Sequence, residues 1–335
     1  MSSAWCSVVK YLVVTHTDID GVAAAALYSY LVGAKPVKVL YTEPYLLDRA
    51  LRKLRSITGL HRIVFTDLGL NNNVVEAVAE TVALLTSKGI SVEWYDHHIW
   101  NDDWIAKLKK SGSRIYIDRT TCATGVVALY APKEREEVNQ EFIEELVRGV
   151  CSGDLFRFDH WKGPWYIRVV RRHDESSWRN FVFEKLSSGT AWCREFAERV
   201  VERFEKELAG YRSVDEYISI READGLKLAV VLQHDTVENS FLASYIMARY
   251  GVDVVAITSL DGKISLRSKK YNVRELAVAL GGGGHARASG AKVHIPLSTR
   301  LKQVINKRAV VEYIAKVILD KADLITEVER TTRSH

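Results

Sequence analysis

The sequence predicts an α/β protein in which a parallel-sheet domain is joined by a helical linker to a smaller α/β domain. The chain has 335 residues, which is enough for two domains of ordinary size. Strand-like and helix-like segments alternate in its N-terminal half, as is typical of a parallel sheet covered by helices. A different strand–helix series follows a long charged helical stretch. We therefore place the domains at 1–190 and 226–325, with the linker at 191–225.

Short apolar runs in the N-terminal half predict the strands, and segments of helical periodicity separate them. The expected strands are Val8–Val14, Val37–Tyr41, Ile63–Thr66, Ile90–Tyr95 and Arg114–Ile117. The expected helices are Gly21–Val32, Leu46–Ile57 and Val74–Leu85. Ligands gather at the carboxyl ends of the strands in such sheets, so polar residues that directly follow a strand are the first candidates for a site.

Charged helical patterns dominate the middle of the chain, from Glu134 to Val150 and from Trp192 to Ser213. Apolar residues spaced by four form one stripe along the second stretch, which predicts a long helix leading to the next domain. The members of this stripe are Phe196, Val200, Phe204 and Leu208. The elements expected after it are Lys227–Leu232, Ser240–Arg249, Val252–Thr258, Lys263–Ser268, a glycine cluster and strand Lys292–Ile295.

The composition excludes several classes of protein. Hydrophobic residues make up 47% of the chain and charged residues 27%, which is typical of a globular protein and not of a disordered or fibrous one. We find no apolar run of ~18 residues that would span a membrane and no signal-peptide pattern. The four cysteines lack C-x-x-C spacing, so we expect neither a zinc site nor a disulfide framework, and a cytoplasmic location. Two Met and three Gln suggest a thermophilic source.

The charge is distributed unevenly along the chain. From Leu226 to the C-terminus, 17 Lys and Arg face 10 Asp and Glu, a balance of +7, so the first 225 residues carry −2 of the total of +5. This division predicts a carboxylate-rich site in the first domain and an anion-binding surface on the second. A basic domain that is merely soluble explains the count equally well.

A cluster of His and Asp directly follows the first predicted strand, in the motif T-H-T-D-I-D-G at Thr15–Gly21. His16, Asp18 and Asp20 concentrate negative charge with no Lys or Arg among them, which is costly unless a cation neutralises it. Gly21 permits a tight entry into the following helix. The alternative is that Asp20 caps that helix and Asp18 is solvated.

Three further motifs place acidic or imidazole groups after buried segments. Asp67 follows one strand, Asp96, His97 and His98 follow another, and Asp154 ends an apolar stretch. A lone Asp at such a place is more often a cap or turn residue, but a parallel sheet would bring all of these together. Imidazole and carboxylate without thiolate suit Mn²⁺ or Mg²⁺. The set suffices for two ions ~3.5–4 Å apart, as in-line phosphoryl displacement requires, with Asp67 as the bridge.

A glycine-rich motif, G-G-G-G-H-A-R-A-S-G-A, occupies Gly281–Ala291. Successive glycines expose backbone N–H groups, and such a loop at a helix start can cradle a phosphate. His285 adds a hydrogen-bond donor and Arg287 a charge, and Arg267 and Ser268 lie upstream in S-L-R-S-K-K. The alternative is an ordinary flexible glycine loop.

These motifs, in this order, resemble those of the DHH phosphoesterases, a family named for the triplet at Asp96–His98. The glycine run resembles the G-G-G-H signature of the C-terminal domain associated with that family, and the resemblance extends from about Val8 to Ile325. The family includes RecJ exonucleases, nanoRNases and phosphatases of 3′-phosphoadenosine 5′-phosphate. RecJ proteins usually carry Asp where this chain has His16. The resemblance implies a hydrolase that works with two Mn²⁺ ions, or with Mg²⁺.

The resemblance also implies a role for each matched residue. The metal ligands would be His16 and Asp18 for one ion, Asp20, His97 and Asp154 for the other, and Asp67 as the bridge. His98 would face the substrate phosphate, and Asp96 would orient a neighbouring histidine. The catalytic group would thus be Asp67, Asp96, His97 and His98. The substrate would be bound by His98, Asn239, Arg267, Ser268, Gly283, Gly284 and His285.

From these motifs and the resemblance we expect an exonuclease that degrades short single-stranded oligonucleotides to mononucleotides. Three alternatives stay open: a phosphatase of 3′-phosphoadenosine 5′-phosphate, a cyclic-dinucleotide phosphodiesterase, and a non-catalytic replication scaffold. Scaffold relatives have lost metal ligands, whereas every ligand position is filled here. We expect no membrane partner, and a homodimer is one possible assembly.

Overall fold

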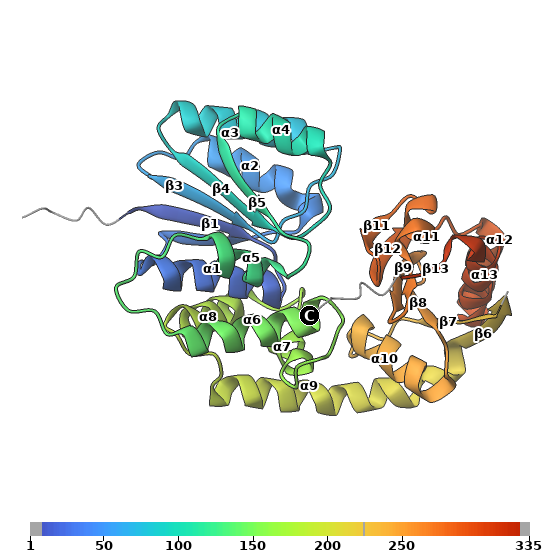
Figure 1. Ribbon diagram of the computed structural model, residues 1–335. Helices are drawn as coiled ribbons and strands as arrows, with labels where there is room; N and C mark the ends of the chain where they lie inside the picture. The colour runs from blue at the N-terminus through green and yellow to red at the C-terminus, as the bar shows by residue number, and fades with distance from the viewer. Residues whose placement is uncertain (1–8, 224, 329–335) are drawn as a thin grey trace, which may run out of the picture. The chain divides into compact units, whose positions relative to one another are not determined.

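The computed structural model describes residues 9–223 and 225–328. The chain divides into two compact units, Met1–Glu198 and Arg199–His335 (Figure 1). The division falls inside α9 (Arg194–Arg212), the long helix expected between the domains. In the part of the chain that the structure describes, no helix has the length and apolar character needed to cross a bilayer.

The first unit is built on a five-stranded sheet in the order β2-β1-β3-β4-β5, and all of its strand pairs are parallel. The strands are β1 (Tyr11–Thr15), β2 (Lys38–Tyr41), β3 (Arg62–Thr66), β4 (Ser91–Asp96) and β5 (Ser113–Ile117). Thr15 pairs with Thr66, and Thr66 with Tyr95, so β1, β3 and β4 end at about the same level. The loops that leave them therefore start side by side, which confirms the expected parallel sheet and its common edge.

Helices cover both faces of this sheet. They are α1 (Ile19–Val32), α2 (Leu47–Arg55), α3 (Val75–Ser87), α4 (Asp102–Lys110) and α5 (Ala123–Tyr130), and the short η1 (Pro44–Leu46) precedes α2. A further layer packs against α1 and consists of α6 (Gln140–Asp154), α7 (Gly163–Val169) and α8 (Ser176–Ser187). Figure 1 shows α2, α3 and α4 on one face and α1 and α5 on the other. All residues of α1 are buried, because α1 packs on the sheet and against α5, α6 and α8.

The helix expected at Glu134–Val150 begins later and ends later than its charge pattern predicts. The Asn139 side chain accepts a hydrogen bond from Phe142 N at 3.1 Å and so caps α6 at its start. At the other end α6 continues to Asp154, which places that carboxylate on the last turn of a helix. The sequence predicted neither α7 nor α8.

The expectation that the cysteines form no disulfide framework is wrong for one pair. Cys122 and Cys151 form a disulfide with a Cα–Cα distance of 5.1 Å. Cys122 follows β5 and directly precedes α5, while Cys151 lies on α6. The two residues are 29 positions apart, and only the packing of α5 against α6 brings them together. Cys193 is a free thiol, and Cys6 lies outside the described residues.

The second unit has a six-stranded mixed sheet in the order β11-β12-β9-β8-β7-β6. Its strands are β6 (Ile218–Ala223), β7 (Leu226–Leu232), β8 (Val254–Thr258), β9 (Lys263–Ser268), β11 (Gly283–His285) and β12 (Ala288–Lys292), and β10 (Tyr271–Asn272) pairs with β13 (Thr326–Glu327). Its helical elements after α9 are η2 (Val214–Tyr217), α10 (Asn239–Tyr250), α11 (Arg274–Ala279), α12 (Leu297–Ile305), α13 (Arg308–Leu319) and η3 (Ala322–Leu324). Among the described strands of the large sheet, β7 and β8 are parallel and the other neighbours are antiparallel. An apolar core lies between the sheet and helices α11 and α13.

Two expectations about the glycine-rich segment are wrong. The glycines do not open a helix: they follow α11 and lead into β11, which pairs with β12 as an antiparallel hairpin. The strand expected at Lys292–Ile295 is β12, which ends at Lys292. Gly284 has φ 135°, and a Cβ there would lie 2.7 Å from Ala288 O. The hairpin therefore accounts for Gly284 without any phosphate.

Two glycine substitutions test this interpretation of the hairpin. Gly284→Ala should lower the free energy of unfolding by about 1–3 kcal/mol, because the new methyl group meets the backbone of β12. Gly283→Ala should change it by less than ~0.5 kcal/mol, since a Cβ there meets nothing within 4 Å. Urea unfolding of both variants measures the difference. Equal losses in the two variants would contradict the hairpin packing.

Candidate metal centre

The loop that follows β1 begins the site. It turns sharply into α1, because a Cβ at Gly21 would lie 2.7 Å from His16 O. Asp18 caps the helix, and its Oδ1 accepts a hydrogen bond from Gly21 N at 3.2 Å. The capping role that the sequence offered for Asp20 thus belongs to Asp18. Asp20 points instead toward α5, where Ala123 N and Thr124 N donate to its carboxylate.

Asp67 lies at the centre of the site, just past β3. Its φ is 55°, a left-handed conformation that non-glycine residues adopt rarely and at a cost of about 1–3 kcal/mol. Its N–H donates to Tyr95 O at 3.0 Å, which fixes the residue between β3 and β4. Among the described residues of the first unit, three groups of metal-binding side chains all include Asp67, with donor atoms within 4.8 Å of one another. The fold therefore presents one carboxylate to several neighbours at once.

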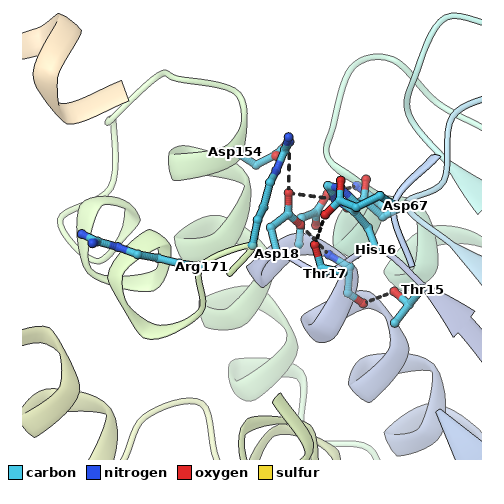
Figure 2. A network of polar contacts seen from close by, with 12 residues as sticks. Thr15, His16, Thr17, Asp18, Asp67, Asp154 and Arg171 are labelled. Carbon is cyan, nitrogen blue, oxygen red and sulfur yellow. Dashed lines mark hydrogen bonds and ion pairs between the residues drawn. The ribbon is translucent and has the colours of Figure 1, made fainter. Parts of the chain in front are cut away.

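The first group surrounds the His16 ring (Figure 2). Its Nδ1 lies 2.9 Å from Asp18 Oδ2 and 3.2 Å from Asp67 Oδ2, and its Nε2 lies 3.1 Å from Glu43 Oε2. Burial acts to lower the pKa of His16, but the surrounding carboxylates outweigh it and raise that pKa well above its usual value. A cation that binds here must therefore displace a proton from the ring.

The second group surrounds His97. Its Nε2 lies 3.4 Å from Asp67 Oδ1, 3.6 Å from Asp154 Oδ2 and 3.7 Å from Asp20 Oδ2. Burial raises the pKa of Asp154 to about 6; the charge of His97 acts to lower it, whereas the charges of Asp67 and Asp18 add to the rise. Burial and the same kind of repulsion hold the pKa of Asp20 well above its usual value. Negative charge is therefore in excess at this point of the molecule.

The donor set fits a divalent cation. Donor atoms that share one ion at bond lengths of ~2.1 Å lie about 3–4 Å apart, and His97 Nε2 lies 3.4–3.7 Å from one oxygen each of Asp67, Asp154 and Asp20. Asp20, Asp67 and His97 have donor atoms within 4.8 Å of one another, whereas Asp154 joins this set only through His97. Imidazole and carboxylate donors without thiolate favour Mn²⁺ or Mg²⁺ over a structural zinc. Buried carboxylates that repel one another gain from a cation between them.

Asp96 and His98 form a fixed pair beside these groups. The fully buried Asp96 accepts a hydrogen bond from Trp100 Nε1 at 2.7 Å and lies 2.8 Å from His98 Nδ1. Burial acts to raise the pKa of Asp96, but the charge of His98 outweighs it and keeps this pKa low. An ionised carboxylate only accepts, so Nδ1 of His98 carries a proton and its Nε2 points away from Asp96.

The sequence missed two residues of the site. Glu43, at the carboxyl end of β2, contacts His16 and accepts a hydrogen bond from Thr17 Oγ1. Arg172, which follows α7, brings a guanidinium nitrogen to 3.7 Å from Asp18 Oδ2. Glu43 is the second residue after the expected strand Val37–Tyr41, so a slightly wider form of the rule that found Asp67 also identifies Glu43. No feature of the sequence near Arg172 signals its place.

In the second unit, the expected substrate residues fall into two sets. His285 pairs with Ala288 across the hairpin, and Ala288 pairs with Arg267, so His285 and Arg267 share one face of the sheet. The N-terminus of α10 lies on the same face: Arg267 Nε donates to Ser240 Oγ at 3.3 Å, and Asn239 Nδ2 donates to Ser265 Oγ at 2.9 Å. Gly283 and Gly284 form the edge strand β11.

Ser268 differs from the other expected substrate residues. It is fully buried, its hydroxyl donates to Asp253 O, and it accepts from the backbone of Lys270 and Tyr271. The structure therefore gives Ser268 a place in a turn, apart from the face that holds Arg267.

Comparisons with known proteins agree with this architecture. Residues 225–311 match the DHHA1 domain. Exonuclease RecJ bound to manganese shares the fold over 92% of this chain and 90% of its own, with 16% identity and a TM-score of 0.54. RecJ from Thermus thermophilus in complex with Mn²⁺ shares it over 92% of this chain and 52% of its own, with 14% identity and a TM-score of 0.50. No curated protein sequence matches the chain.

The chain thus has the fold that these two RecJ structures share. Its second unit carries a DHHA1 domain, and its first unit holds buried clusters of His and Asp at the carboxyl edge of a parallel sheet. This confirms the resemblance that the sequence motifs indicated. At identities of 14–16% the likeness to RecJ concerns the fold.

Proposed function

We propose that the protein is a manganese-dependent phosphodiesterase that degrades short single-stranded oligonucleotides to mononucleotides. The observation that carries the proposal is the convergence of three His/Asp groups on Asp67. This convergence occurs in a fold that two manganese-bound RecJ structures share. A non-catalytic scaffold has no need of a buried, mutually repelling carboxylate cluster, which is costly to maintain.

The residues proposed to hold the metals come from four segments of the first unit. They are His16, Asp18 and Asp67 for one ion, and Asp20, Asp67, His97 and Asp154 for the other. Mn²⁺ ions, when bound, supply Lewis acidity to a phosphoryl oxygen and lower the pKa of a bound water. Glu43 would orient the His16 ring through its contact with Nε2.

His98 is the proposed contact to the reacting phosphate. Burial acts to lower the pKa of His98, but the charge of Asp96 outweighs it and raises that pKa. The ring therefore favours its charged form, in which Nε2 donates to an anionic oxygen. Such a donor is fixed before the substrate arrives and stabilises the charge that develops on a phosphoryl oxygen.

We assign the binding of further substrate phosphates to Arg267, His285 and Asn239 of the second unit. The planar guanidinium of Arg267 can donate two parallel hydrogen bonds to a phosphate. The hairpin fixes His285 on the same face of the sheet as Arg267. Asn239 Oδ1 is buried and has no hydrogen-bond partner among the described residues, so a donor from a bound nucleotide would satisfy it. These few groups suit a short substrate.

Removing one phosphate contact should affect substrate binding more than metal binding. Arg267→Ala and His285→Ala should each raise KM about tenfold, because a charge-assisted hydrogen bond is worth roughly 1.5–3 kcal/mol. Arg300→Ala, which removes the same charge from an exposed position on α12, is the matched control. Steady-state kinetics and Mn²⁺ titration of the three variants measure the difference. Unchanged KM in both test variants would remove this face from the proposed binding site.

The substrate itself is tested with end-labelled RNA and DNA from dimers to 20-mers in Mn²⁺. We expect kcat/KM to peak at about two to five nucleotides, because few phosphates are contacted. We also expect a shallow salt dependence, since each neutralised phosphate of a single strand contributes about −0.7 to the log–log slope.

Three results would replace the proposed substrate with another. Processive digestion of long strands with a steep salt slope would favour a RecJ-like exonuclease. Phosphate release from 3′-phosphoadenosine 5′-phosphate, without cleavage of any oligonucleotide, would favour the monoesterase. Cleavage of cyclic dinucleotides alone would favour that class of phosphodiesterase.

A further inference from the structure

The Cys122–Cys151 disulfide joins the two segments that hold Asp20 and Asp154. Cys122 directly precedes the first turn of α5, and that turn binds the Asp20 carboxylate. Cys151 lies on the last turns of α6, three residues before Asp154. Both cysteines are buried, and their Cα atoms are 5.1 Å apart. The bond therefore connects the supports of two carboxylates that contact His97.

The contacts of Asp20 depend closely on the residues next to Cys122. Ala123 N donates to Asp20 Oδ2 at 2.8 Å, and Thr124 N donates to Oδ1 at 2.9 Å. The Thr124 hydroxyl donates to the same Oδ1 at 2.6 Å. Because these donors belong to the two residues after Cys122, a shift of the Cys122 backbone moves the Asp20 carboxylate with it.

Asp154 is coupled to Cys151 through the end of α6. Leu155 N donates to Cys151 O at 3.1 Å, so the turn that carries Asp154 is closed on the cysteine itself. Close packing with the following segment fixes this turn, since a Cβ at Gly153 would lie 2.7 Å from Gly163 O. A movement of Cys151 therefore changes the position of Asp154 relative to His97.

The two carboxylates have a physical reason to separate. Asp20 and Asp154 both lie within 3.7 Å of His97 Nε2, and Asp67 belongs to the same cluster. Like charges so close repel one another in a buried site. A covalent link between their supports opposes that repulsion before any cation binds.

We propose that Cys122 and Cys151 are positioning residues of the metal centre. Their disulfide fixes the distance between the carboxylates of Asp20 and Asp154, and its loss weakens the ion that these residues hold with His97. This inference rests on the proposed function, because it assigns that ion to that group. Supporting contacts around metal ligands are typically worth 10–100-fold in affinity, and we expect a loss of at least about tenfold here.

The test compares Mn²⁺ binding by three forms of the full chain, using calorimetry at 25 °C. The forms are the oxidised protein, the protein reduced by a phosphine, and Cys122→Ala/Cys151→Ala. In the reduction, the phosphine gives two electrons to the S–S bond and takes oxygen from water, leaving two thiols and a phosphine oxide. The phosphine is then removed under argon so that only the thiols differ. Cys193→Ala in its oxidised form is the control, because it removes a free thiol and leaves the Cys122–Cys151 bond intact.

We expect two Mn²⁺ binding events in the oxidised protein and a weaker Kd for one of them in both altered forms. The event assigned to His16 and Asp18 should keep its Kd. If the disulfide served stability alone, its loss would lower the Tm of the altered forms and leave both Kd values unchanged. That result would overturn the positioning role, as would a thiol assay that finds Cys122 and Cys151 reduced in air-oxidised protein. Absence of Mn²⁺ binding by the oxidised protein would instead overturn the metal centre itself, together with the positioning role.

Discussion

Asp67→Asn should abolish turnover, with kcat/KM falling by at least about a thousandfold, while the fold is retained. The lost charge belongs to the carboxylate common to three His/Asp groups, and no neighbouring side chain replaces it. Retention of the fold has a physical basis, because Asn is nearly isosteric with Asp and tolerates the left-handed φ of 55°. The substitution also leaves the backbone N–H of residue 67 in place, and this group donates to Tyr95 O.

Asp159→Asn is the matched control for this experiment. It makes the same chemical change on the loop that follows Asp154, at an exposed residue whose ion-pair partner, Arg157, lies 3.5 Å away. The measurement is turnover of an oligonucleotide substrate in saturating Mn²⁺, with circular dichroism to check folding. A folded Asp67→Asn protein with near wild-type turnover would contradict the two-metal site.

Asp154→Asn should have opposite effects on turnover and on stability. It removes a proposed metal ligand, so turnover should fall below detection. In the metal-free protein it also removes a charge whose pKa burial and the neighbouring carboxylates raise to about 6. At pH 7 that charge opposes folding, and its removal should raise the free energy of unfolding by about 1–3 kcal/mol.

Stability is measured by urea unfolding in excess chelator at pH 7 and again at pH 4.5. The sign follows from the raised pKa: the folded protein favours the protonated carboxyl, so the cost of the wild-type charge appears as the pH rises through about 6. The difference between the two proteins should therefore shrink at pH 4.5. A metal-free variant that is less stable than the wild type at pH 7 would show that Asp154 forms a net favourable ion pair with His97.

Most residues of the proposed metal site could be predicted from the sequence by one rule, which is that ligands follow the carboxyl ends of parallel strands. Parallel strands end at a common edge, and β1, β3 and β4 each end with a charged or imidazole group next in the chain. The same rule extends to Glu43, although Thr42 separates it from the end of β2. The sequence indicated Asp154 only by its place after an apolar stretch, and the rule does not cover it, since it lies on the last turn of a helix and follows no strand.

The features that the sequence could not reveal depend on contacts between distant segments. The disulfide forms because α5 packs on α6, and the spacing of Cys122 and Cys151 carries no sign of that packing. The place of the glycine run also depends on such contacts. Four glycines suit a phosphate loop and a tight hairpin equally, and only the pairing of β11 with β12 decides between them.

The complete burial of α1 limits how this site can be altered, in the laboratory or by evolution. A surface helix has an outer face on which most substitutions are tolerated, but every residue of Ile19–Val32 is covered. Four consecutive alanines, Ala23–Ala26, are wholly enclosed, so even one added methylene group must displace a neighbour. Because α1 begins at the metal-site loop, such a displacement reaches Asp18 and Asp20. Efforts to retune the ligands are therefore better directed at the surrounding loops than at this helix.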